Sequence, residues 1–130
     1  MDCADDGGPI VKRELPLTTP SVGGYTLVDA FPNVVFDIPS AIAWPKGDPA
    51  AAPFVLERTG QIKRIENATT ARTVLDFGSQ VHIGGEGGAL GLVLHPQFGD
   101  GTGPKPYVYV WYNALPLLQR LQRYTWSTTL

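Results

Sequence analysis

The sequence has a single cysteine, few basic residues and no long apolar run, and each shortage excludes a class of structure or partner. Cys3 is alone, so the chain can form neither an internal disulfide nor a cysteine-based metal site. No run approaches the roughly 18 apolar residues that a transmembrane helix needs. The ten Lys and Arg residues are spread along a chain of net charge -2, which disfavours nucleic acid and acidic membrane surfaces as partners.

The position of Cys3 is more informative than its number. A cysteine near the start of a chain, followed by the small and polar residues 4–9, is typical of a mature bacterial lipoprotein, whose thiol carries the lipid. Two alternatives stay open: a secreted or periplasmic protein anchored through Cys3, and a plain irregular N-terminus. No apolar segment of signal-peptide length precedes Cys3.

Turn-forming residues are abundant. Fifteen Gly and twelve Pro interrupt short runs that are rich in aromatic and β-branched residues, which favours many short strands. Residues 1–23 have no apolar period and are expected to form a flexible N-terminal arm, whereas residues 24–130 are expected to fold. A helical pattern appears only around residues 114–122, where Pro116 weakens it.

The short runs predict an all-β fold. We expect strands at residues 25–31, 33–37, 41–44, 54–58, 61–65, 73–77, 90–94, 107–112 and 120–126. Thr59-Gly60 is expected to close a two-residue hairpin. The strands from 41 to 77 would form a four-stranded meander, and those from 89 to 126 would begin a second sheet. Open sheet edges in this scheme indicate a propeller with further blades, of which this chain is the front section.

The segment 81–96, VHIGGEGGALGLVLHP, surrounds Glu86 with glycines. Its spacing fails the dinucleotide-binding pattern G-x-G-x-x-G, because Leu90 occupies the place of the third glycine. One interpretation is that Gly84 to Gly88 lets the backbone cross between two sheets, with Glu86 merely solvated. The other is that the crossing lines a binding site, where the Glu86 carboxylate accepts strong hydrogen bonds from ligand hydroxyl groups.

Several motifs occur together in the order and spacing of one known family. They are Phe31-Pro32-Asn33, the run Phe54-Val55-Leu56-Glu57-Arg58-Thr59-Gly60-Gln61-Ile62, the run Gly84-Gly85-Glu86-Gly87-Gly88-Ala89-Leu90-Gly91, and His95-Pro96-Gln97-Phe98. Through them, residues 27–126 resemble the soluble quinoprotein glucose/sorbosone dehydrogenases. That family forms a six-bladed β-propeller that uses pyrroloquinoline quinone (PQQ) and calcium. The resemblance implies that residues 24–130 are about the first one and a half blades, the N-terminal portion of an incomplete propeller.

The resemblance also implies a function, the oxidation of an aldose or related polyol by hydride transfer to the quinone. In the family, the catalytic histidine, the calcium ligands and the basic residues that hold PQQ lie in later blades. No catalytic or metal-binding residue is therefore expected in this chain, and the remaining blades would bind PQQ and calcium. Glu86, with its neighbours Gly85 and Gly87, is carried over as a contact for the sugar substrate.

Other polar and aromatic residues favour structural roles. His95 precedes Pro96 and is expected to be a buried turn residue bonded to the backbone, and His82 lacks the carboxylate partners of a metal site. Asp100 is the only carboxylate of residues 99–103, which is too few for a calcium loop. The aromatic run 107–112 is apolar on both faces, which favours packing between neighbouring sheets over a sugar-stacking surface.

Two other functions stay open. A non-catalytic extracellular propeller that binds a protein or carbohydrate partner, as in the hedgehog-interacting proteins, would share these motifs without oxidising sugars. A complete small β-domain with an unrelated function would unfold cooperatively as a single species.

We expect the isolated 130-residue chain to be inactive in sugar oxidation, because the resemblance places the base and the cofactor ligands in other blades. A dye-linked dehydrogenase assay with added PQQ, calcium and an aldose checks this. Dye reduction above a protein-free control would contradict the expectation.

Overall fold

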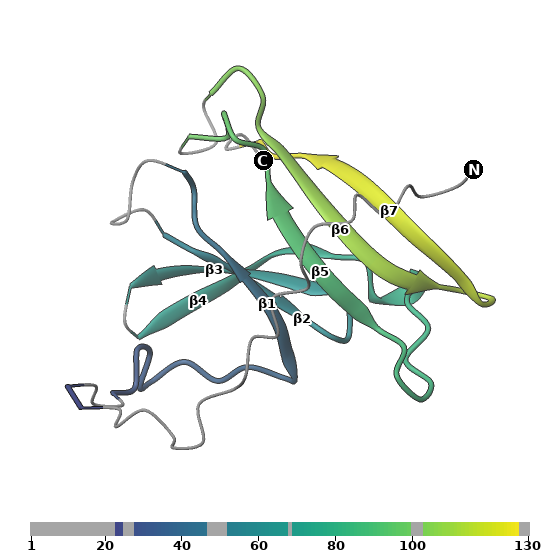
Figure 1. Cartoon of the computed structure of the whole chain (residues 1–130), viewed down its shortest axis with the longest axis horizontal. Helices are drawn as coiled ribbons and strands as arrows, with labels where there is room; N and C mark the ends of the chain where they lie inside the picture. The colour runs from purple at the N-terminus through teal and green to yellow at the C-terminus, as the bar shows by residue number, and fades with distance from the viewer. Residues whose placement is uncertain (1–22, 25–27, 47–51, 68, 100–102, 128–130) are drawn as a thin grey trace, which may run out of the picture.

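The computed structural model describes residues 23–24, 28–46, 52–67, 69–99 and 103–127, and the fold is all-β (Figure 1). The strands are β1 (Pro39–Ala43), β2 (Phe54–Glu57), β3 (Gln61–Asn67), β4 (Thr70–Asp76), β5 (Ala89–Leu94), β6 (Tyr107–Ala114) and β7 (Leu118–Thr125). A short 3-10 helix, η1 (Gly78–Gln80), lies between β4 and β5. Within the described residues, the strands form sheet A, of order β1-β2-β3-β4, and sheet B, of order β5-β6-β7.

The expected succession of two antiparallel meanders is confirmed. Within each sheet every strand pairs with the next one along the chain, and three-residue loops join β2 to β3 and β6 to β7. Local pairing of this kind follows from runs of aromatic and β-branched residues separated by turn residues. The weak helical pattern at 114–122 forms no helix, because those residues make the turn between β6 and β7 and much of β7.

The hairpin between β2 and β3 has a longer loop than expected. Its loop is Arg58–Gly60, whereas the sequence predicted the two residues Thr59-Gly60. The Gly60 N–H donates to the carbonyl oxygen of Glu57 at 2.9 Å and closes the loop. The prediction was wrong because a three-residue loop that ends in glycine is also a common hairpin connection, and strand propensity alone does not decide between the two.

The two strands expected before β1 do not form in the described residues 28–37, so this prediction was wrong. Instead, the Val34 N–H donates to the carbonyl oxygen of Phe31 at 3.0 Å and makes a turn. The Asp37 N–H donates to the carboxylate of Glu57 at 2.7 Å. Because that buried side chain supplies a hydrogen-bond partner, the segment packs on sheet A without joining it. The expected arm over residues 1–23 lies outside the described residues except for Gly23.

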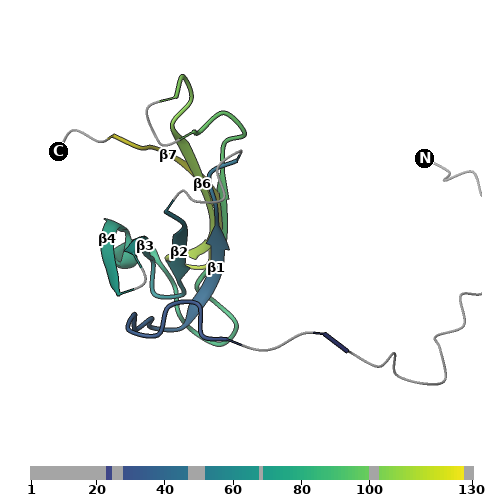
Figure 2. The same cartoon turned by 90° about the vertical axis from the view of Figure 1, so that its left-hand side faces the viewer.

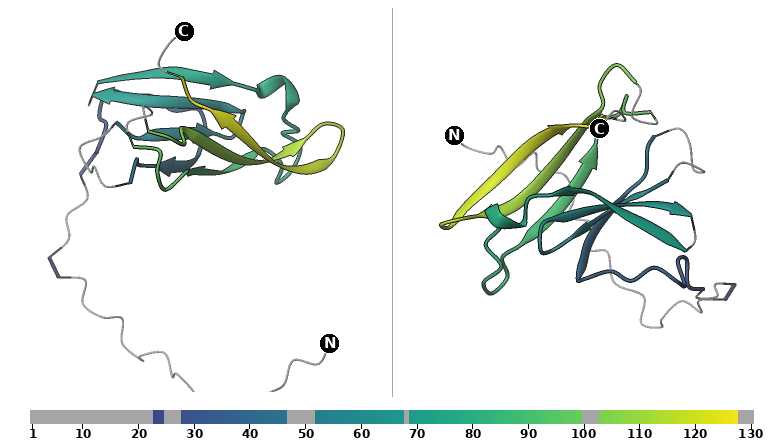
Figure 3. Two further views of the ribbon diagram at one scale, coloured as in Figure 1. Left: turned by 90° about the horizontal axis from the view of Figure 1, so that it is seen from above. Right: turned by 180° about the vertical axis from the view of Figure 1, so that it is seen from behind.

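The two sheets stack face to face, and their first strands lie side by side. β5 contacts β1 and β2, and Figures 1 and 2 show β1 next to sheet B. The layers are also visible from above in Figure 3. The core between the sheets includes Phe54, Leu56, Ile62, Phe77, Leu92, Leu94, Phe98, Val108, Val110 and Tyr112, all buried. Burial of these side chains is the main stabilising contribution to the stack.

The opposite face of sheet A carries an ion pair whose carboxylate is buried. Glu57 is 1% exposed, and its carboxylate lies 2.7 Å from the ammonium group of Lys63. The same Glu57 oxygen accepts the N–H of Asp37, so the N-terminal segment covers the pair. A buried carboxylate that loses its counter-charge is costly, because water cannot solvate it.

Lys63→Met is expected to lower the free energy of unfolding by about 3 kcal/mol, because it leaves Glu57 buried without its cation. The double change Glu57→Gln with Lys63→Met is expected to recover part of this loss. Urea unfolding of the variants measures both effects. Arg72→Met is the control, since its ion pair with Glu66 is exposed and contributes less than about 1 kcal/mol. Equal losses for Lys63→Met and Arg72→Met would contradict the prediction.

Candidate functional site

The glycine-rich segment forms a closed loop between the two sheets, as expected for a crossing. The Gly87 N–H donates to the carbonyl oxygen of Gly84 at 2.9 Å, and Gly85 has a φ of 57°. A positive φ at the second position of a four-residue turn matches type II′ and suits glycine. Asn113 of β6 closes the base of the loop, because its C=O accepts the His82 N–H at 2.8 Å. The Asn113 N–H donates to the carbonyl oxygen of Gly88, the residue before β5, at 2.9 Å.

Glu86 lies in this turn, and its side chain is exposed. Within the described part of the chain, no hydrogen bond or ion pair engages its carboxylate. The carboxylate is therefore available to water or to the hydroxyl groups of a ligand. Both interpretations of the sequence fit this position, so the substrate contact stays a prediction.

The Arg58 side chain holds the loop from the side of sheet A. Its Nε donates to the carbonyl oxygen of Gly87 at 2.7 Å, and its Nη2 donates to the carbonyl oxygen of Gly85. The carbonyl oxygen of Arg58 also accepts the N–H of Ala89, the first residue of β5, at 2.9 Å. Sequence reasoning missed this residue, because Arg58 and Gly87 are separated by 29 positions and no local pattern connects them.

The glycine after the turn is required by the close approach of Arg58. A Cβ added at Gly88 would lie 2.4 Å from the Cγ of Arg58, and its φ of 145° is rarely adopted by other residues. At Gly85, by contrast, an added Cβ would meet no atom within 4 Å.

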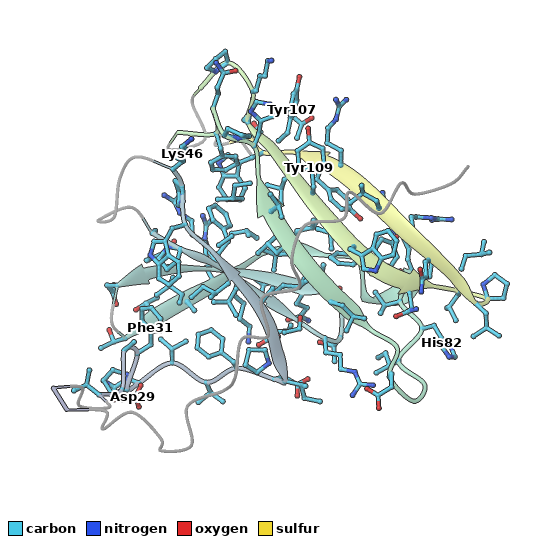
Figure 4. The ribbon with its side chains drawn as sticks, in the orientation of Figure 1. Asp29, Phe31, Lys46, His82, Tyr107 and Tyr109 are labelled. Carbon is cyan, nitrogen blue, oxygen red and sulfur yellow. The ribbon has the colours of Figure 1, made fainter. Side chains whose placement is uncertain are left out.

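The residues around Glu86, which are Gly85, Gly87 and His82, differ in what they can offer a ligand. The carbonyl oxygens of Gly85 and Gly87 already accept hydrogen bonds from Arg58, so their contact with a substrate stays a prediction. His82 is half-buried and lies next to Gly84, where an added Cβ would be 2.7 Å from its Nε2 (Figure 4).

The other candidate residues lie away from this loop or outside the described residues. His95 is half-buried where a buried side chain was expected, and its Nδ1 accepts the Gln97 N–H at 3.0 Å, which confirms its expected bonding to the backbone. Cys3 and Asp100 are not among the described residues. Across the described ranges, no three His, Cys, Asp or Glu side chains are placed to share a metal ion. The same residues contain no helix of sufficient length and apolarity to cross a membrane.

A cleft of about 530 Å³ opens between the outer strands of the two sheets, β4 and β7. The Nε of Arg64, the hydroxyl of Tyr124 and the Nε1 of Trp126 are buried in its walls without a hydrogen-bond partner. Burial raises the pKa of Tyr124, the neighbouring Tyr112 adds to this rise, and Arg120 opposes it. The arrangement leaves polar groups unsatisfied, which is unusual in a fully packed region.

Large apolar side chains on the outer face of sheet B are also exposed. The aromatic run of β6 alternates as expected, with Val108 and Tyr112 in the core and Trp111 40% exposed. Tyr107 and Tyr109 project from the outer side of β6 (Figure 4). We predicted that both faces of β6 pack against neighbouring sheets. The described residues show this packing for one of the two faces.

Comparison with protein-family models, with curated proteins and with solved structures finds no match to this chain.

Gly88→Ala is expected to lower the free energy of unfolding by about 3 kcal/mol, because the new Cβ collides with Arg58 at an unfavourable φ. Gly85→Ala is the matched control and is expected to cost only about 1 kcal/mol, from the positive φ alone. Chemical unfolding of both variants measures the difference. Equal costs would mean that Arg58 does not pack against Gly88.

Proposed function

We propose that this chain forms the first two sheets of a β-propeller that oxidises an aldose or related polyol with PQQ and calcium. Its own contribution to the site is Glu86, as a contact for sugar hydroxyl groups. The observation that carries the proposal is the stacking of two consecutive meanders with β1 and β5 side by side. Propeller blades are arranged in this way around a central channel.

The exposed apolar side chains on the outer face of sheet B support the presence of further blades. Val93, Trp111 and Leu121, from three neighbouring strands, are 62%, 40% and 63% exposed on this face. An apolar sheet face is normally covered by another layer. A third sheet packed here would bury it in the way that sheet B buries one face of sheet A.

The cleft beside β7 supports the same architecture. Sheet A has four strands and sheet B has three in the described residues, so part of β4 has no strand facing it. A fourth strand paired with β7 would fill the cleft and could satisfy the buried nitrogen atoms of Arg64 and Trp126. Among the described strands, β7 is the outer strand of sheet B, and an outer strand offers backbone groups with which such a strand pairs.

The position of Glu86 suits a polyol ligand. Its carboxylate is exposed, and the loop that carries it joins consecutive sheets, where propellers place loops that contact ligands. A carboxylate accepts hydrogen bonds only, and each bond from a sugar hydroxyl is charge-assisted. Neutral compounds with several neighbouring hydroxyl groups are therefore the ligands that Glu86 favours.

Among the described residues, no three His, Cys, Asp or Glu side chains lie together as metal ligands. In the proposal, other blades hold the cofactor, and no chemical step is assigned to this chain. Glu86 binds and orients the substrate.

The full-length gene product, reconstituted with PQQ and calcium, is expected to reduce a redox dye when an aldose is added. Glu86→Ala in that protein is expected to raise KM about tenfold while kcat changes little, because a contact made equally in ground and transition states affects binding alone. Glu66→Ala is the control, since Glu66 is an exposed carboxylate paired with Arg72 on sheet A.

Absence of both cofactor absorbance and dye reduction would overturn the proposal in favour of a non-catalytic binding propeller. Sugar oxidation with an unchanged KM in Glu86→Ala would remove Glu86 from the site.

A further inference from the structure

We infer that Arg58 is a positioning residue that fixes the place of the Glu86 carboxylate relative to sheet A. This inference rests on the proposed function, in which Glu86 contacts the substrate. Arg58 would then act on substrate binding through the loop, without touching the substrate itself.

The first support is the pair of hydrogen bonds on either side of Glu86. One guanidinium group donates through Nε to the carbonyl oxygen of Gly87 and through Nη2 to the carbonyl oxygen of Gly85. These carbonyl groups belong to the residues that flank Glu86. Because the guanidinium is planar and rigid, it holds the Gly85–Glu86 and Gly87–Gly88 peptide groups in one relative orientation, which restricts the backbone at Glu86.

The second support is that Arg58 is itself fixed to the fold. Its N–H donates to the carbonyl oxygen of Ile38 at 2.9 Å, and its C=O accepts the N–H of Ala89 at 2.9 Å. Its aliphatic stem packs against Gly88, where no Cβ could be accommodated. The side chain therefore transmits the position of the β2–β3 hairpin to the loop that precedes β5.

The third support is the electrostatic arrangement. Among the described residues, the ion pairs are Lys63–Glu57 and Arg72–Glu66, so Arg58 does not pair with Glu86. Its charge is directed at backbone carbonyl oxygens, which leaves the Glu86 carboxylate free to accept ligand hydroxyl groups. A lysine at position 58 would offer a point charge without the planar two-nitrogen fork, so it could not reproduce this geometry.

The experiment uses the full-length gene product and has a first readout that needs no sugar. Arg58→Gln is expected to speed amide hydrogen exchange at Gly87 and Ala89 by about tenfold or more, because two charge-assisted hydrogen bonds that hold the loop are lost. Arg58→Lys keeps the charge and most of the stem, and it is expected to show raised exchange at the same amides. Arg72→Gln removes an exposed arginine from β4 and is expected to leave this exchange unchanged.

The second readout is sugar oxidation by the reconstituted protein. Arg58→Gln is expected to raise KM about tenfold with kcat changed less than about threefold, as for loss of a binding contact. Adding Glu86→Gln to Arg58→Gln is expected to raise KM little further, because both changes disable the same contact. Arg58→Lys keeps the positive charge but lacks the planar two-nitrogen group, and it is expected to leave KM raised. This result would show that the geometry of the guanidinium matters in addition to its charge.

Unchanged exchange at Gly87 and Ala89 in Arg58→Gln would overturn the inference, and so would full rescue of KM by Arg58→Lys. Additive effects of Arg58→Gln and Glu86→Gln on KM would also overturn it. If the unmodified protein binds no cofactor and oxidises no sugar, the proposed function fails. The exchange readout then still decides whether Arg58 positions the loop.

Discussion

Mutual burial of one apolar face from each sheet is the constraint on which the rest of this structure depends. Phe54 and Leu56 of β2 and Val110 and Tyr112 of β6 are almost fully buried in the interface. A small antiparallel sheet with one apolar face is not stable alone in water, so each meander needs the other. The edge-to-face contact of Phe54 with Phe98, at 5.6 Å between ring centroids, adds a specific geometry to this burial.

Stacking then dictates the shape of the connection between the sheets. The chain leaves η1, pairs briefly with the end of β6 through Val81, and must enter β5 beside β1. Between these points the backbone passes close to Arg58 and closes against Asn113. Glycines permit this close approach. Glu86 carries the one carboxylate among residues 82–88 of the loop. The exposure of that carboxylate is a consequence of sheet packing.

The strands that could be predicted are those whose local pattern and tertiary environment agree. The alternation in β6 placed Val108, Val110 and Tyr112 on one face, and all three are buried. The prediction of strands was wrong at residues 28–37, although their composition is typical of strands. The buried carboxylate of Glu57 accepts the Asp37 N–H, so this segment does not join the sheet. The loop between β2 and β3 was predicted one residue too short, because strand propensity does not show where the backbone pairing of a hairpin ends.

The sequence by itself determined an all-β chain, two successive meanders and a glycine-lined crossing that carries Glu86, because these features depend on side-chain alternation and turn chemistry between neighbours. Only the tertiary structure decided that Arg58 binds the carbonyl oxygens around Glu86 and that Lys63 pairs with the buried carboxylate of Glu57. It also decided that a cleft remains beside β7. Such contacts depend on how the two sheets and the segment before them stack. This stacking is set by the summed burial of many side chains that are far apart in the sequence, and no short stretch of residues encodes it.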